Sequence, residues 1–157
     1  MKPYFKVITT LFLISVVKVS FAQTPSFGNY KTKIFIGRAA KLKIKGNALA
    51  ERYKTAISNS YNDDPYIRKF HGKGGLNFAG HYCFAYWGCG SDCQQSAIVD
   101  LQTGKVYDGP TAARQFEYRR WSRLLIVNRP GDKSDCAVCQ PEYWILNEQT
   151  KHFVKIK

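Results

Sequence analysis

The chain has 157 residues, 45% of them hydrophobic, and its 24 lysines and arginines outweigh 11 acidic residues to give a net charge of +13. This length predicts one domain with a hydrophobic core and excludes a multidomain protein. The charge favours an anionic partner, such as an envelope polysaccharide, an anionic lipid or an acidic protein, or else it is a basic surface without a specific partner. Specific nucleic-acid binding is not expected, because no nucleic-acid-binding motif accompanies the charge.

The N-terminus has the pattern of an export signal. A basic start precedes a mostly apolar run over residues 7–17, and small residues at Ser20 and Ala22 mark a cleavage site before Gln23. We therefore predict a signal peptide over residues 1–22 and a location in the periplasm or outside the cell. No later segment is long and apolar enough to cross a membrane.

Residues 23–46 are predicted to be a basic leader that ends in a short strand. Over residues 41–45 lysine alternates with leucine and isoleucine, and this period of two is typical of a half-exposed strand. Gly46 and Asn47 interrupt the pattern, and a single globular domain is predicted to occupy residues 47–157.

The domain is predicted to begin with one helix over residues 48–60, capped by Asn47. The apolar residues at helical spacing, which would face the core, are Leu49, Ala50, Tyr53, Ala56 and Ile57. The sequence Asn-Asp-Asp-Pro at 62–65 ends the helix, and residues 62–77 are predicted to be loop.

From Phe78 onward the pattern becomes that of an antiparallel sheet. The predicted strands are 80–87, 96–101, 104–108, 121–128, 142–147 and 151–156. In the first strand both alternating faces are largely apolar, so we predict a central strand that is covered on both sides, with the helix as one cover. A weak echo of the second and third strands near the C-terminus divides the strands into two meanders. The predicted fold class is therefore α+β, mostly antiparallel β, with two three-stranded meanders that form a small sandwich or barrel.

The cysteines predict disulfides, because exported chains fold in an oxidising compartment. Cys89 and Cys93 bracket one loop, and Cys136 and Cys139 bracket another. The simplest pairing joins the two cysteines within each loop, and pairing between the loops stays open. Cys83 is left over and is predicted to be a buried free thiol that acts as a small hydrophobic residue.

The four paired cysteines also allow two other interpretations. Together they have the number and spacing of a four-thiolate zinc site, although export argues against it because an oxidising compartment favours disulfides. Cys136 and Cys139 form a CxxC sequence, but Gln140 and Pro141 follow instead of the helix that a redox-active pair needs. We therefore expect no metal and no cofactor.

No convincing set of catalytic residues is present, so the protein is predicted not to be an enzyme. His81 and Cys83 share a strand face, but side chains at this spacing lie about 7 Å apart at the backbone, which is too far for a catalytic pair. A structural role for His81 is favoured. Asp100 is expected to stabilise its own turn through its carboxylate.

One segment interleaves aromatic rings with arginines. The candidate binding residues in and after it are Tyr118, Arg119, Arg120, Trp121 and Arg123. Such a surface could bind a sugar or a polyanion by stacking and charge. The alternative is an ordinary edge strand whose arginines discourage pairing with another chain.

Three short motifs carry a likeness to known sequences. Residues 77–82 read NFAGHY, residues 87–93 read WGCG-x2-C, and residues 100–107 read D-x2-TG-x-VY. With these motifs the chain resembles a group of uncharacterised exported bacterial proteins, most firmly over residues 77–107. The resemblance implies no activity and no catalytic residues.

The leading hypothesis is a small exported protein with disulfides that binds or inhibits an envelope or extracellular macromolecule without catalysis. One alternative is a periplasmic thiol-redox or zinc-binding protein that uses Cys136 and Cys139 with Cys89 and Cys93. Another is polyanion binding, such as polysaccharide binding, through the arginine and lysine clusters. The loops at 88–95 and 129–141 are favoured as functional regions over the first strand.

Overall fold

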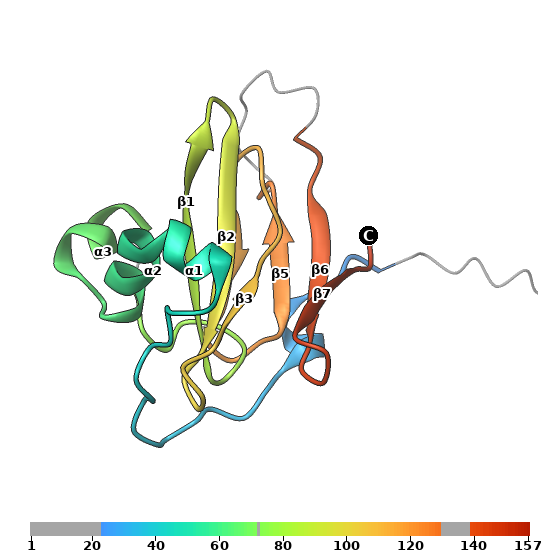
Figure 1. Ribbon diagram of the computed structural model, residues 1–157. Coiled ribbons are helices and arrows are strands. Elements are labelled where there is room, and N and C mark those ends of the chain that lie inside the picture. The colour runs from blue at the N-terminus through green and yellow to red at the C-terminus, as the bar shows by residue number, and fades with distance from the viewer. Residues whose placement is uncertain (1–22, 72, 130–138) are drawn as a thin grey trace, which may run out of the picture.

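The computed structural model describes residues 23–71, 73–129 and 139–157. Its helical elements are η1 (Phe27–Tyr30), α1 (Ala48–Arg52), α2 (Lys54–Tyr61) and α3 (Pro65–His71). The strands of these residues form two antiparallel sheets, one of β1 (Tyr82–Gly90), β2 (Cys93–Asp100) and β3 (Val106–Asp108), the other of β4 (Phe116–Tyr118), β5 (Leu124–Val127), β6 (Glu142–Asn147) and β7 (His152–Lys155). The sheets pack face to face, and the helices cover the outer face of the first (Figure 1).

This architecture confirms the predicted α+β, mostly antiparallel fold in its sandwich form. The described strands stay in two separate sheets and do not close into a barrel. The second sheet holds one strand more than predicted, because β4 joins it at the edge beside β5. β4 is the first half of the arginine–aromatic segment and lies at the edge of its sheet, as the edge-strand interpretation expects, while Arg119, Arg120 and Trp121 follow the strand.

The predicted helix over residues 48–60 is present but divided. Asn47 caps α1 as predicted, since its side-chain oxygen accepts a hydrogen bond from the Ala50 N–H at 2.9 Å. Tyr53 leaves the helical conformation and separates α1 from α2, and at this break its ring packs on the Trp87 ring with 4.5 Å between centroids. Ala50 of α1 and Ile57 of α2 are fully buried against the first sheet.

The prediction of a loop over residues 62–77 is wrong, because the segment contains α3. The same Asn-Asp-Asp-Pro sequence that ends α2 also starts α3. Asp64 accepts a hydrogen bond from the Tyr66 N–H at 2.9 Å, and Pro65 occupies the first helical position, where its missing N–H costs nothing. One helix-breaking sequence thus ends the helix before it and begins the helix after it.

β1 separates the two layers of the core. Tyr82 and Phe84 face the second sheet, where they pack with residues such as Leu125 and Leu146. The alternate residues of β1 face the helices: they are Cys83, Ala85 and Trp87. The predicted burial of both strand faces is therefore confirmed.

The predicted central position of this strand is wrong, since β1 lies at the edge of its sheet. Asn77 takes the place of a neighbouring strand. Its side-chain oxygen accepts from the Phe84 N–H at 2.6 Å, and its side-chain N–H donates to the Phe84 carbonyl at 3.0 Å. One amide side chain thereby satisfies both edge groups of a buried residue.

Residues 27–44, here called the N-terminal belt, run from the second sheet past the first sheet to the helices (Figure 1). Phe27 and Tyr30 of η1 pack against the outer face of the second sheet. Further along, backbone N–H groups of the belt donate to carbonyl oxygens beside both sheets at 2.8–2.9 Å: Thr32 to Trp121, Phe35 to Gly80, Ala40 to Leu101 and Lys43 to Gly104. The belt therefore ties the two sheets together.

The strand predicted over residues 41–45 does not form. This part of the belt pairs with no strand in the described structure. Leu42 and Ile44 pack against the core beneath the helices, while the lysines that alternate with them are exposed. The alternation therefore records an extended segment buried along one side, which has the same period as a strand.

Candidate functional site

The structure distributes the predicted binding residues over different surroundings. Tyr118 lies in the core, its ring centroid 4.8 Å from that of Phe84, and burial raises the pKa of its hydroxyl. Arg119 pairs with Glu117 at 2.7 Å and lies over the Phe27 ring. Trp121 packs edge-on against the same Phe27 ring, whereas Arg120 is exposed and Arg123 borders a groove.

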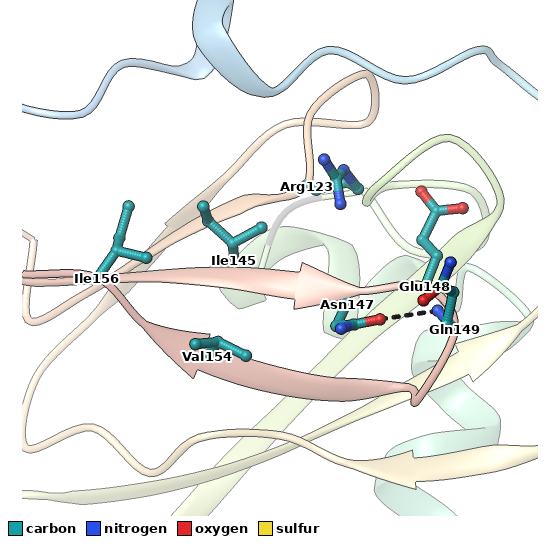
Figure 2. Close-up of a pocket in the computed structure, with 7 residues that line it drawn as sticks. All are labelled: Arg123, Ile145, Asn147, Glu148, Gln149, Val154 and Ile156. Atoms are coloured by element: carbon teal, nitrogen blue, oxygen red, sulfur yellow. Dashed lines mark hydrogen bonds between the residues drawn. The ribbon is translucent and has the colours of Figure 1, made fainter.

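Arg123 lies where two open cavities meet. One cavity, of about 570 Å³, lies over β6 and β7 and is lined by Arg123, Ile145, Asn147, Glu148, Gln149, Val154 and Ile156 (Figure 2). The other, of about 750 Å³, lies along the belt and is lined by residues 31–36 together with His81, Gln102, Arg123 and Glu148. Arg123 and Glu148 line both, so the two cavities adjoin at these residues, and we call them together the Arg123 groove.

Backbone hydrogen bonds hold the centre of the groove in place. The Arg123 N–H donates to the Tyr30 carbonyl at 2.9 Å, and the Arg123 Nη1 donates to the Leu146 carbonyl at 3.3 Å. Asn147 shapes the turn after β6, because its side-chain oxygen accepts from the Gln149 N–H at 2.9 Å. The Tyr30 carbonyl of the belt therefore holds the Arg123 backbone, and the Leu146 carbonyl of β6 holds its guanidinium.

The groove carries an excess of positive charge. Lys31, Lys33 and Arg123 line it, against a single carboxylate from Glu148. None of the ion pairs within 4.0 Å found among the described residues engages these three cations. Their charges are therefore available to an anion that enters the groove.

His81 contributes a neutral ring to the groove wall. Its side chain is only 14% exposed, and its Nε2 lies 4.0 Å from the Asp100 carboxylate. Burial lowers the pKa of His81 and Lys151 adds to the decrease, while Asp100 and Glu148 oppose it. At neutral pH the imidazole can thus exchange hydrogen bonds with a ligand but adds no charge.

Asp100 has the structural role expected from the sequence. Its two carboxylate oxygens accept hydrogen bonds from the Gln102 N–H at 2.8 Å and from the Thr103 hydroxyl at 3.0 Å, which fixes the turn before β3. Cys83, two residues after His81, is a fully buried free thiol on the helix side of β1. Burial raises the pKa of this thiol to about 12, which keeps it protonated.

Cys89 and Cys93 form the predicted disulfide at the tip of the β1–β2 hairpin. With their sulfurs joined, these residues have no thiolates to offer to a zinc site. Cys139 is also disulfide-bonded. Cys136 lies outside the described residues, as does most of the loop at 129–141, so the pairing within that loop stays a prediction.

Within the described part of the chain, no group of three or more His, Cys, Asp or Glu side chains could hold a metal ion. No helix formed by these residues has the length and apolarity needed to span a membrane. Comparison with models of known families, with curated proteins and with solved structures gave no match.

The sequence signal for the groove was incomplete. Arg123 was among the candidate residues, and Lys31 and Lys33 belong to the lysine clusters proposed for polyanion binding, but His81 and Glu148 were not predicted to bind a ligand. Apart from Arg123, these residues come from the belt, the turn before β1 and the β6–β7 turn, which only the folded chain brings together. The one usable signal was the run of lysines before Glu51.

Proposed function

We propose that the protein is an exported, non-enzymatic binding module that captures an anionic ligand of the cell envelope or its surroundings in the Arg123 groove. The observation that carries the proposal is the meeting of Lys31, Lys33 and Arg123, without ion-pair partners, in open cavities of ligand size. The signal pattern at residues 1–22 and the Cys89–Cys93 disulfide support export, because disulfides persist in oxidising compartments.

The chemistry of the groove favours a phosphate or carboxylate group. A guanidinium offers paired N–H donors that match two oxygens of such a group. Lys31 and Lys33 are two residues apart on a non-helical part of the belt, and side chains at this spacing leave an extended backbone on the same side. The lysines and Arg123 therefore make a cationic wall, and His81 adds a hydrogen-bonding group.

Butyl phosphate, titrated calorimetrically into the mature chain, tests the proposal. We expect R123Q to weaken binding about tenfold or more, which is the effect of losing one charge-assisted contact. R120Q is the matched control, since Arg120 is exposed and does not line the groove, and it should bind like the parent protein. Absence of binding would sink the proposal, and equal losses in both variants would instead favour general polyanion binding by the basic surface.

A further inference from the structure

The Arg123 groove is charged at one end and aliphatic at the other. Figure 2 shows Arg123 and Glu148 at one end, while Ile145, Val154 and Ile156 lie at the other. The aliphatic end is open to solvent, because Val154 is 51% exposed and Ile156 is 40% exposed. The two ends belong to one continuous cavity, so a single molecule can touch both.

The aliphatic end is the part of the second sheet's outer face that residues 23–71, 73–129 and 139–157 leave exposed. Over the neighbouring part, Phe27 and Tyr30 of the belt pack on Leu124 and Tyr143. Ile36, on the belt side of the groove, is 95% exposed. Most of the large hydrophobic side chains that are exposed in the described structure thus line this groove. Their exposure to water is unfavourable, and a ligand that covers them would be stabilised by their burial.

We infer that the ligand is a single amphiphile, with an anionic head at Arg123, Lys31 and Lys33 and a hydrocarbon part along Ile145, Val154 and Ile156. The inference rests on the proposed function and names the class of its ligand. Charge complementarity places the head, and the aliphatic end of the same cavity receives the chain.

The charge and shape of the groove disfavour other occupants. A second copy of this protein, related by a twofold axis through the groove, would bring the same cations face to face. A flat bilayer would reach the exposed Val154 and Ile156 more easily than Ile145 and Arg123, which are only partly exposed. A dispersed amphiphile with one hydrocarbon chain satisfies both ends without either cost.

Glu148 adds a further constraint on the head group. Its carboxylate lines both cavities and faces the same space as Arg123 in Figure 2. The Glu148 carboxylate therefore repels an anionic head group and weakens its binding. We expect E148Q to tighten the binding of an alkyl phosphate, and Q149E, which adds a carboxylate to the same lining, to weaken it.

The test compares butyl, hexyl and octyl phosphate below their micelle concentrations, with octyl glucoside as a neutral amphiphile of the same chain length. We expect affinity to rise about two- to fourfold for each added methylene group, and octyl glucoside to bind far more weakly than octyl phosphate. The double variant V154S/I156S should lose this dependence on chain length yet keep its affinity for butyl phosphate. Y66S, at an exposed aromatic residue on α3 outside the groove, is the control.

Each contrary result has its own meaning. Equal affinities for butyl and octyl phosphate would overturn the amphiphile and leave the anion-binding function intact. Equal affinities for octyl phosphate and octyl glucoside, or binding only to vesicles that contain an anionic phospholipid, would also overturn it. If none of the alkyl phosphates binds, the proposed function itself fails.

Discussion

Asn77 shows how much of the fold can depend on one side chain. It makes both hydrogen bonds to the backbone of Phe84, which is 1% exposed and lies on the free edge of β1. The residue belongs to the NFAGHY motif, which singles it out in the sequence. Its partner was not predictable, because a side-chain amide does not indicate which backbone groups it will bond to. Asp100 was predictable, because its partners lie within the same turn.

Replacing Asn77 by alanine should destabilise the protein strongly. Two buried backbone groups of Phe84 would lose their partners, and each such group costs about 1–3 kcal/mol, so we expect a loss of about 2–6 kcal/mol. Urea unfolding followed by circular dichroism measures it. Asn47→Ala is the comparison, because it removes a helix cap worth about 1 kcal/mol and one part-buried hydrogen bond, to the Val106 carbonyl at 3.0 Å, but leaves no pair of buried strand groups without partners. Equal losses would mean that the edge of β1 finds other partners.

His81 makes the stability of the fold depend on pH. Burial holds its pKa below the ordinary value of 6.5, so protonation favours the unfolded chain, and the stability present above pH 6.5 decreases as the pH falls below that value. His81→Gln should flatten this decrease below about pH 6.5, whereas the exposed His152→Gln should not. Asp63 and Glu142, whose pKa values are lowered from 3.8 and 4.5, act only at more acidic pH. Parallel profiles for both histidine variants would contradict the assignment.

Among the elements, the N-terminal belt depends on two glycine positions against which its backbone packs. Gly80 and Gly104 both have positive φ, and a Cβ on either would lie 2.0–2.2 Å from a carbonyl oxygen of the belt, at Lys33 and Lys41 respectively. Only glycine allows this close approach together with that backbone conformation.

Gly104→Ala should therefore loosen the belt, and Gly46→Ala is its matched control. Gly46 also has positive φ, but a Cβ there meets nothing within 4 Å. Both substitutions carry a backbone cost of about 1–2 kcal/mol, and we expect Gly104→Ala to lose about 1–3 kcal/mol more through the clash with Lys41. Urea midpoints give the comparison, and proteolysis between residues 33 and 44 should become faster only in Gly104→Ala. Equal midpoints would show that the belt moves aside freely.

Elements were predictable where local patterns decide them. The Asn47 cap, the hairpin of β1 and β2 and the strands near the C-terminus all leave such patterns. The sequence did not predict the short strand β4, because it spans only three residues. It did not predict the helix α3, because the Asn-Asp-Asp-Pro sequence at 62–65 indicates the end of one helix more clearly than the start of the next. The false strand at 41–45 arose because one-sided burial of an extended segment also gives a period of two.

At the scale of the whole molecule, the sequence predicted two packed meanders but not the groove between distant segments. The groove joins the belt, the turn before β1 and the strands β6 and β7, which are far apart in sequence. Its cations are ordinary lysines and an arginine in a chain rich in both. The shape and charge of the groove therefore depend on how the belt lies across the sheets, which no local pattern encodes.

The same packing predicts that the two sheets unfold together. Phe84 of the first sheet contacts Phe116 and Tyr118 of the second, with ring centroids 5.1 and 4.8 Å apart, and the belt bonds to both sheets. Phe84→Ala should cost about 3–5 kcal/mol, shared by the whole domain. Variants that keep only Trp87 or only Trp144 report the two sheets separately by fluorescence. Coincident urea transitions, shifted equally by Phe84→Ala, are expected because neither sheet can bury its inner face alone. A Trp144 transition that stays in place would mean that the second sheet is an independent folding unit.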